Sequence, residues 1–155
     1  MAAQFENLSS DVIWECARKS NAFLCKRKQG GGLQFSRDPM NLSNKHSRKY
    51  EGFLNDRAIG IQPDSNTVTL TTKIASKYNK PVNALHASSF SATTPSRKLY
   101  ESIVNSTAKK GYRPDLRHAT VARASAIKAS QRKKKAAPAP KLRGAKAKKA
   151  AVEKS

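Results

Sequence analysis

The strongest constraint on this chain is its positive charge. Its 155 residues include 31 Lys or Arg and 10 Asp or Glu, which gives a formal net charge of +21. A compact chain of this charge repels itself, so we expect it to function beside a polyanion. Apolar residues make up 37% of the chain, which is low for a domain that relies on a large core of its own. The sequence therefore predicts a small domain that gains stability from binding its partner.

The charge divides the chain into a body and a tail. Residues 131–155 hold ten Lys or Arg and one acid, and they contain Ala, Lys and Pro with few large apolar groups. Such a segment cannot bury enough surface to offset the entropy of ordering. We predict a folded domain at residues 1–131 and a disordered or extended Lys/Ala/Pro-rich basic tail at residues 132–155. The tail either follows phosphates or serves as a solubilising or nuclear-import segment.

The sequence argues against a membrane protein, a secreted protein and an enzyme. No apolar run approaches the roughly 20 residues of a membrane-spanning helix, and residues 1–25 lack a basic-then-apolar signal pattern. Cys16 and Cys25 are too few for a disulfide framework, which favours an intracellular setting. The histidines, cysteines and acids form no metal, nucleophile or acid–base motif. We therefore expect no enzyme activity, no cofactor, no small-molecule substrate and no membrane partner.

The first third of the body predicts a helix followed by a hairpin. Ser9, Ser10 or Asp11 can cap the helix, which we expect to end at Asn21. Its apolar side is formed by Val12, Ile13, Trp14, Cys16 and Ala17.

Residues 22–28 and 33–37 then form an expected hairpin around the glycines at 30–32. These glycines lack the Gly-Lys-Ser/Thr of a phosphate-binding loop, so they do not indicate nucleotide binding. Residues 38–56 predict irregular structure, in which Phe53 is expected in the core.

A second hairpin is the clearest local pattern. Residues 58–62 and 67–73 alternate, and the sequence of residues 63–66 favours a turn. The apolar face of this hairpin consists of Ile59, Ile61, Val68 and Leu70. In the less informative residues 75–93, the possible core anchors are Val82, Leu85 and Phe90.

Two helices are predicted after the hairpins. Thr94 can cap the first, with Pro95 at its opening position and Gly111 at its end. Its apolar stripe is Leu99, Tyr100, Ile103, Val104 and Thr107. The second opens at 113–115 and runs to about Ser130. Its buried seam is Leu116, Thr120 and Ile127, beside a cationic flank of Arg113, Arg117 and Lys128.

Together these patterns predict an α+β fold: a small basic domain with short antiparallel hairpins, an N-terminal helix and two C-terminal helices, plus an extended basic tail.

Three segments of the chain also resemble a known protein family. They are VIWECARKSNAFLCKR at 12–27, FSRDPMNLSNKHSRKYEG at 35–52 and GYRPDLRHATVARASAIKASQ at 111–131. They resemble, in order, the eukaryotic family of ribosomal large-subunit protein number twenty-eight. The resemblance spans residues 8–131.

The resemblance implies a non-catalytic constituent of the cytoplasmic large ribosomal subunit, assembled in the nucleolus. Its implied partners are large-subunit rRNA, including eukaryotic expansion segments, and neighbouring large-subunit ribosomal proteins. One alternative is a nucleolar pre-ribosome assembly factor with the same domain, although such factors usually carry more cysteines and an acidic C-terminal region. Another is a chromatin protein, because the tail is like that of a linker histone and the last two helices superficially resemble helix-turn-helix.

The candidate RNA contacts are cations for phosphates and rings for bases. In the body we expect cationic contacts from Lys26, Arg27, Lys28, Arg37, Lys45, His46, Arg48, Lys49, Arg57, Lys109, Lys110, Arg113, Arg117, Arg123 and Lys128. The tail adds Arg132, Lys133, Lys134, Lys135, Lys141 and Arg143. Tyr50 and Tyr112 are the candidate stacking rings, with core packing as the alternative for Tyr50. Lys73, Lys77 and Lys80 are left out because no neighbouring pattern supports them.

Overall fold

The computed structural model describes residues 8–27, 29, 31–77, 80, 82–133, 136, 141 and 143–145. Its elements, in chain order, are α1 (Ser10–Ala17), β1 (Leu24–Lys26), β2 (Gln34–Ser36), β3 (Ile59–Asp64), β4 (Thr67–Lys73), η1 (Ala75–Lys77), β5 (Leu85–Phe90), α2 (Ser96–Ser106), η2 (Ala108–Lys110), η3 (Pro114–Leu116) and α3 (Arg117–Ser130). The predicted α+β class is confirmed. The tail prediction falls largely outside the described residues.

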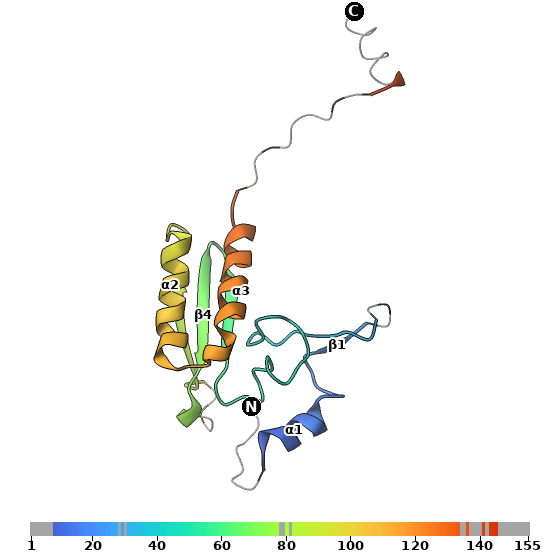
Figure 1. Ribbon diagram of the computed structural model, residues 1–155, viewed down its shortest axis with the longest axis vertical. Coiled ribbons are helices and arrows are strands. Elements are labelled where there is room, and N and C mark those ends of the chain that lie inside the picture. The colour runs from blue at the N-terminus through green and yellow to red at the C-terminus, as the bar shows by residue number, and fades with distance from the viewer. Residues whose placement is uncertain are drawn as a thin grey trace, which may run out of the picture.

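Two helices on a sheet form the larger part of the molecule. Strands β3, β4 and β5 make an antiparallel sheet in that order, and α2 and α3 lie beside each other against it (Figure 1). A smaller part contains α1 and the β1–β2 hairpin (Figure 1). Residues 38–56 run between the two parts, and they are irregular, as predicted.

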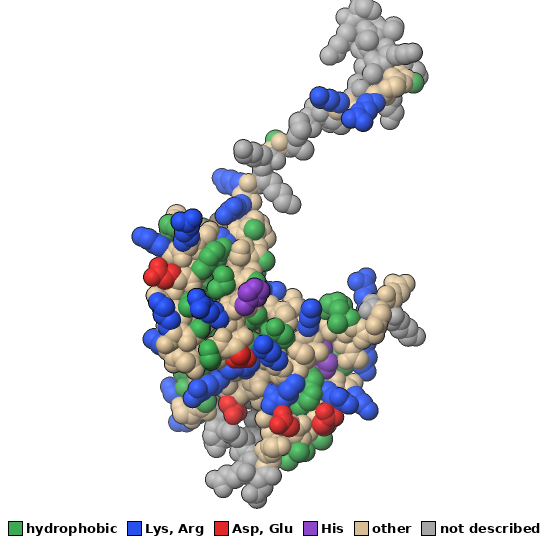
Figure 2. Space-filling model, viewed as in Figure 1, with side chains coloured by type: hydrophobic (Ala, Val, Ile, Leu, Met, Phe, Trp, Pro, Cys, Tyr) green, Lys and Arg blue, Asp and Glu red, His purple; other side chains and the backbone are tan. Residues whose placement is uncertain are grey.

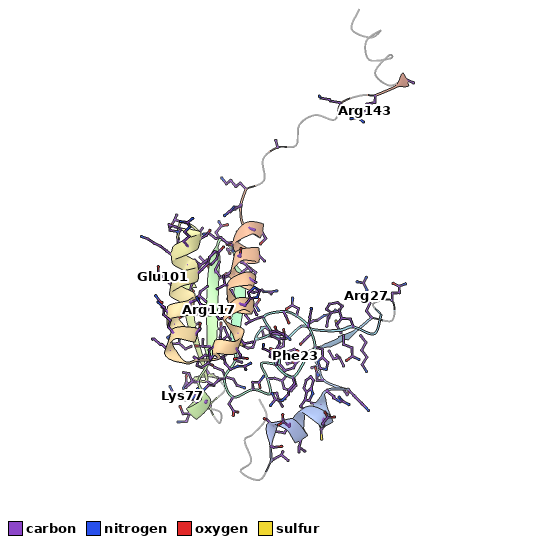
Figure 3. The ribbon with its side chains drawn as sticks, in the orientation of Figure 1. Phe23, Arg27, Lys77, Glu101, Arg117 and Arg143 are labelled. Carbon is purple, nitrogen blue, oxygen red and sulfur yellow. The ribbon has the colours of Figure 1, made fainter. Side chains whose placement is uncertain are left out.

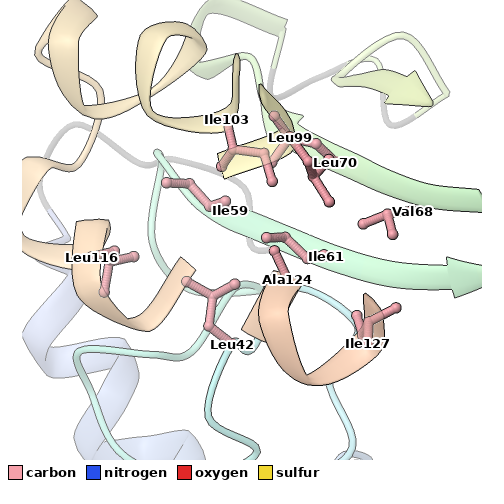
Figure 4. Close-up of a cluster of buried hydrophobic side chains, with 10 residues drawn as sticks. All are labelled: Leu42, Ile59, Ile61, Val68, Leu70, Leu99, Ile103, Leu116, Ala124 and Ile127. Atoms are coloured by element: carbon pink, nitrogen blue, oxygen red, sulfur yellow. The ribbon is translucent and has the colours of Figure 1, made fainter. Parts of the chain in front are cut away.

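The core lies between the sheet and the two helices (Figure 4). The four predicted apolar residues of β3 and β4 are all buried, as are the predicted helix residues Leu99, Ile103, Leu116 and Ile127. Ala124 of α3 is fully buried as well, and its small side chain lets the helix approach the sheet closely. Each large aliphatic side chain buried here contributes about 1.5–3 kcal/mol.

The second hairpin turns later than predicted. Pro63 and Asp64 pair with Val68 and Thr67, so both belong to β3 and the connection is Ser65-Asn66. Proline is tolerated because β3 is an edge strand of the sheet, where a missing N–H can face away from the ladder.

Strand β5 has no counterpart among the predicted elements. Its residues are mostly short and polar, and backbone pairing with β4 defines it rather than an alternating pattern. The expected anchors Val82 and Leu85 are wrong, because their side chains are 91% and 46% exposed. Phe90 is confirmed as an anchor, since it is half-buried against the core.

The helix ends differ from prediction by a few residues. Ser9 caps α1, as expected, by accepting a hydrogen bond from the Val12 N–H at 3.3 Å. The helix ends at Ala17 rather than Asn21, although the Asn21 side chain donates to the Ala17 carbonyl at 3.2 Å. The residue preceding α2 is Pro95, so the predicted Thr94 cap is wrong.

Gly111 does not end α2 directly. A 3₁₀ turn, η2, lies between them, and Gly111 follows this turn with a φ of 68°. The second predicted helix likewise opens as the 3₁₀ turn η3 before α3 begins at Arg117.

The irregular residues 38–56 are organised by two buried charged side chains. The Asp38 carboxylate accepts hydrogen bonds from the N–H groups of Met40, Gly52 and Phe53, at 2.9, 2.8 and 3.1 Å. The Lys73 ammonium donates to the carbonyls of Gly52, Phe53 and Asn55, at 3.2, 3.4 and 2.9 Å. These contacts replace the hydrogen bonds that a regular element would make for its own backbone.

Two glycines allow this segment to pack closely. A Cβ atom on Gly52 would lie 2.1 Å from the Met40 Cβ, and one on Gly60 would lie 2.8 Å from the Pro39 carbonyl oxygen. Both positions therefore require the absence of a side chain for residues 38–56 to fold back and to contact β3.

Tyr112 joins the helical part to the sheet. Its hydroxyl donates to the Lys73 carbonyl at 2.6 Å and accepts from the Ala58 and Lys73 N–H groups, each at 3.1 Å. Burial raises the pKa of Tyr112, so the hydroxyl keeps its proton for this role.

Tyr112→Phe should lower the free energy of unfolding by about 1–3 kcal/mol, because it removes the hydrogen bonds of the hydroxyl to the Ala58 N–H and to the Lys73 carbonyl. Chemical denaturation monitored by circular dichroism measures the change. Tyr100→Phe is the matched control, since the described residues offer no hydrogen bond to that hydroxyl although the ring packs on the core. Equal losses in both variants would contradict the role assigned to Tyr112.

Candidate nucleic-acid interface

Most of the predicted cations face solvent. Blue side chains are spread over the whole visible face of the molecule, with few red ones between them (Figure 2). The exposed predicted contacts are Lys26, Arg27, Arg37, Lys45, Lys49, Arg57, Lys109, Lys110, Arg117, Arg132, Lys133, Lys141 and Arg143. Lys28, Lys134 and Lys135 lie outside the described residues. The exposed set comes from both parts of the domain, so it offers phosphates several separate points of contact.

The β1–β2 hairpin carries cations away from the body. Arg27 projects at the far end of the hairpin, beyond Lys26 (Figure 3). The hairpin base is fixed, because the Phe23 and Phe53 rings lie 6.0 Å apart and the Arg37 N–H donates to the Phe23 carbonyl at 2.8 Å. The hairpin therefore presents exposed, charged side chains on an anchored support.

The predicted basic cluster at residues 45–50 divides into outward and inward side chains. Lys45 and Lys49 are exposed. The His46 side chain is only 5% exposed, with Nδ1 2.8 Å from Glu51 Oε1 and Nε2 donating to the Arg18 carbonyl at 2.7 Å. Burial raises the pKa of Glu51, and the hydrogen bond from His46 partly opposes that effect. His46 is thus held inside the fold.

Arg48 also makes contacts within the protein. Its Nε donates to Asp11 Oδ1 at 3.0 Å and its Nη2 to Ser10 Oγ at 2.6 Å. Another bond joins its Nη1 to the Asn55 side chain. Arg48 therefore fastens α1 to the irregular segment.

Tyr50 is half-buried and packs against the core, with the Lys49 ammonium 5.7 Å from its ring centre. Phe53 was expected in the core, but it is half-buried and pairs with Phe23 outside the core cluster between the sheet and the helices, so that prediction is wrong. Of the two candidate stacking rings, Tyr112 has its hydroxyl occupied by the backbone of Ala58 and Lys73.

One pocket brings two predicted cations together from distant segments. Arg57, before β3, and Lys110, in η2, both line a pocket of about 510 Å³ that also includes Ser76 and His86. Two cations and a hydroxyl around one hollow suit a phosphate group.

Arg113 connects three segments through its guanidinium. Nε and Nη2 donate to the two carboxylate oxygens of Asp115, both at 2.9 Å. Nη1 donates to the Arg57 carbonyl and Nη2 to the Lys49 carbonyl, again at 2.9 Å. The Arg113 backbone has a φ of 47°, a conformation that side-chain-bearing residues rarely adopt. These four bonds stabilise that conformation.

The predicted cations of α3 differ in exposure. Arg117 is exposed and lines a groove between α2 and α3 together with Lys109 and Val104. Arg123 is half-buried, and within the described chain its Nε has no hydrogen-bond partner. The Lys128 ammonium donates to the Ala92 carbonyl. Arg117 is therefore the α3 cation with the greatest freedom to meet a ligand.

Sequence reasoning missed two groups of residues. The first is Lys73, which was left out of the RNA contacts and whose structural role had no local pattern: its buried ammonium binds the carbonyls of residues 52, 53 and 55. A pocket of about 330 Å³ is lined by Trp14, Arg18, Lys19, Gln34 and His46. No local pattern could identify it, because its residues come from three separate segments.

The described residues show no group of three His, Cys, Asp or Glu side chains arranged to hold a metal ion. Over the same residues, no helix has the length and apolar character needed to cross a membrane.

Comparisons with known proteins agree on one family. The model of the Ribosomal L28e protein family matches residues 12–130. The large ribosomal subunit protein eL28 of Schizosaccharomyces pombe is 43% identical over 130 residues, which cover 83% of this chain and 97% of the relative. The Dictyostelium discoideum protein of the same name is 32% identical over 136 residues, covering 88% and 98%. The matched region contains nearly all of the described α+β domain.

Arg113→Lys should lower the free energy of unfolding by about 1–2 kcal/mol, because an ammonium cannot reproduce the planar fork that reaches Asp115, Arg57 and Lys49. Urea denaturation measures the loss. Arg117→Lys keeps the charge at an exposed position and should leave stability unchanged. A similar loss in both variants would show that the Arg113 contacts have no special importance.

Asp115 should contribute stability that depends on pH. The hydrogen bonds from Arg113 lower the pKa of Asp115. A carboxyl whose pKa is lowered on folding stabilises the protein above its unfolded pKa, and this contribution is lost as the pH falls. Asp115→Asn should therefore be less stable than wild type at pH 6, and the difference should shrink below about pH 4. A difference that stays constant down to pH 2 would refute this coupling.

Proposed function

The chain belongs to the ribosomal L28e protein family, and from this premise we propose that it is a structural constituent of the cytoplasmic large ribosomal subunit that binds and stabilises folded rRNA through phosphate contacts. The observation that carries the proposal is the family match over residues 12–130. It covers both the β1–β2 hairpin and the helices on the sheet, so the proposal concerns the domain as a whole.

The distribution of charge supports phosphate binding. The ion pairs of the described residues involve Arg18, His46, Arg48 and Arg113. The exposed cations defined above are not members of these pairs, so their charge is available to a ligand. Neutralising phosphates with such side chains releases counterions and provides much of the binding free energy.

The fold supports recognition of shape rather than of sequence. Cations lie on a projecting hairpin, in the pocket of Arg57 and Lys110, and on the exposed side of α3. Folded RNA presents phosphates at many angles, and contacts from several rigid elements select one arrangement of them. We propose no catalytic step, cofactor or small-molecule substrate.

The wider setting is part of the same proposal. The partners are large-subunit rRNA, including eukaryotic expansion segments, and neighbouring large-subunit ribosomal proteins, with assembly in the nucleolus. The curated relatives are named as large ribosomal subunit proteins, which favours a permanent constituent over an assembly factor or a chromatin protein.

Removing phosphate contacts should reduce the salt dependence of RNA binding. We expect the double variant Arg57→Ala/Lys110→Ala to bind a folded rRNA fragment more weakly. The slope of log affinity against log salt should become shallower by about 0.7–0.9 for each lost contact. Fluorescence anisotropy at several salt concentrations measures the slope. Lys77→Ala is the control, because Lys77 is exposed but lies outside the proposed contacts. An unchanged slope in the double variant would remove this pocket from the interface.

Sedimentation of the tagged protein from a cell lysate through a high-salt sucrose gradient tests the assignment itself. We expect it to travel with mature large subunits and polysomes, because many contacts of fixed geometry resist screening. Presence on nuclear precursors alone would indicate an assembly factor. Release to the top of the gradient would reject the structural role.

A further inference from the structure

The pocket between α1 and the β1–β2 hairpin combines an aromatic wall with positive charge. Trp14 and His46 both line it, with ring centres 4.9 Å apart and planes inclined at 37°. Arg18 and Lys19, immediately after α1, also line it, and Gln34 of β2 completes it. Its volume, about 330 Å³, is at the lower end of the range for pockets that take small ligands.

Some polar groups of this pocket are already hydrogen-bonded within the protein, and others remain available to a ligand. Both His46 nitrogens are engaged, at Glu51 and at the Arg18 carbonyl, so the imidazole is locked and supports the Trp14 ring beside it. In the described part of the chain, the Lys19 ammonium and the Gln34 side-chain amide have no hydrogen bond. Arg18 shares its charge with Glu15 at 3.0 Å, but both side chains remain well exposed. The pocket therefore offers a ring, an amide donor and acceptor, and cationic charge at its rim.

We infer that this pocket binds one unstacked RNA base, with the base against Trp14, its edge at the Gln34 amide, and the adjoining phosphate at Arg18 and Lys19. Every base has a π face that can stack on an aromatic side chain, and single-stranded or bulged RNA presents such bases. This inference rests on the proposed function, because it names a specific part of the RNA that the domain takes. It makes Trp14 a stacking ring in addition to the tyrosines considered from the sequence.

The position of the pocket supports an RNA ligand. Gln34 pairs with Lys26 across the β1–β2 hairpin, so the strand that lines the pocket lies beside a strand that ends in exposed cations. Lys45 extends the same region, because it forms a backbone bridge with Phe35 next to Gln34. A nucleotide seated in the pocket would thus have cations available for the phosphates on either side of it.

Trp14 makes the inference testable, because it is the single tryptophan of the chain. The full-length protein is titrated with a twelve-nucleotide single-stranded RNA of mixed sequence, and with an abasic RNA of equal length and charge. Anisotropy of a label on the RNA reports binding, and tryptophan fluorescence reports the pocket. We expect both RNAs to bind. The base-containing RNA should quench Trp14 and bind about tenfold more tightly, as one stacked base would produce.

Two variants test the residues. Gln34→Ala and Lys19→Ala should each raise the concentration of base-containing RNA needed for half-maximal quenching severalfold, and both side chains can be shortened without disturbing a described hydrogen bond. Lys77→Ala should leave it unchanged. Trp14→Leu should reduce the preference for the base-containing RNA. Because Trp14 packs on His46, circular dichroism must first show that this variant is folded.

The outcomes separate the two claims. If both RNAs bind and neither quenches Trp14, or both quench it equally, the base pocket is overturned while the proposed function stands. If neither RNA binds and a folded rRNA fragment also fails to bind, the proposed function falls along with the pocket. Equal quenching midpoints in Gln34→Ala, Lys19→Ala and wild type would reject the assigned roles of these side chains.

Discussion

The structure depends on the buried polar contacts that hold residues 38–56. This segment joins the α1–hairpin part to the helices on the sheet, and it has no regular element of its own. Its backbone groups are instead satisfied by the Asp38 carboxylate, which accepts three N–H groups, and by the Lys73 ammonium, which meets three carbonyls. Burial lowers the pKa of Lys73, and the nearby charges of Asp56 and Asp38 oppose that shift. A buried charge is stable only with such partners.

These contacts explain how a strongly basic chain can fold with a modest core. Some of the cations act as internal cross-links: Lys73 supports the irregular segment, Arg48 attaches α1, and Arg113 ties its turn to Asp115 and to two carbonyls. Each of these cations has a carboxylate nearby that offsets its charge: Asp56 and Asp38 for Lys73, Asp11 for Arg48, and Asp115 for Arg113. The remaining cations stay exposed, where a polyanion can neutralise them. Lys and Arg side chains therefore serve two purposes in this domain: some stabilise the fold, and the others remain exposed to bind a polyanion.

Local patterns predicted the elements whose side chains alternate or recur. The faces of β3 and β4 and the stripes of α2 and α3 could be found because their burial follows the period of a strand or a helix. Strand β5 was missed because its side chains are short and polar, and pairing with β4 decides its conformation. Val82 and Leu85 were predicted to be buried but are exposed, because a single apolar residue outside a periodic pattern says little about burial. Among the candidate contacts, chemistry alone could not separate exposed Lys49 from buried His46.

The sequence by itself determined the α+β class, the basic character, the family resemblance and most of the core, because each is written in composition or in short-range spacing. Only the tertiary structure decided which cations face outward and which, like Arg113, serve the fold. It alone brought Trp14, Lys19 and Gln34 to one pocket, and Arg57 to Lys110. The physical reason is that exposure and pocket formation depend on contacts between distant segments, and the packing of the whole chain establishes those contacts.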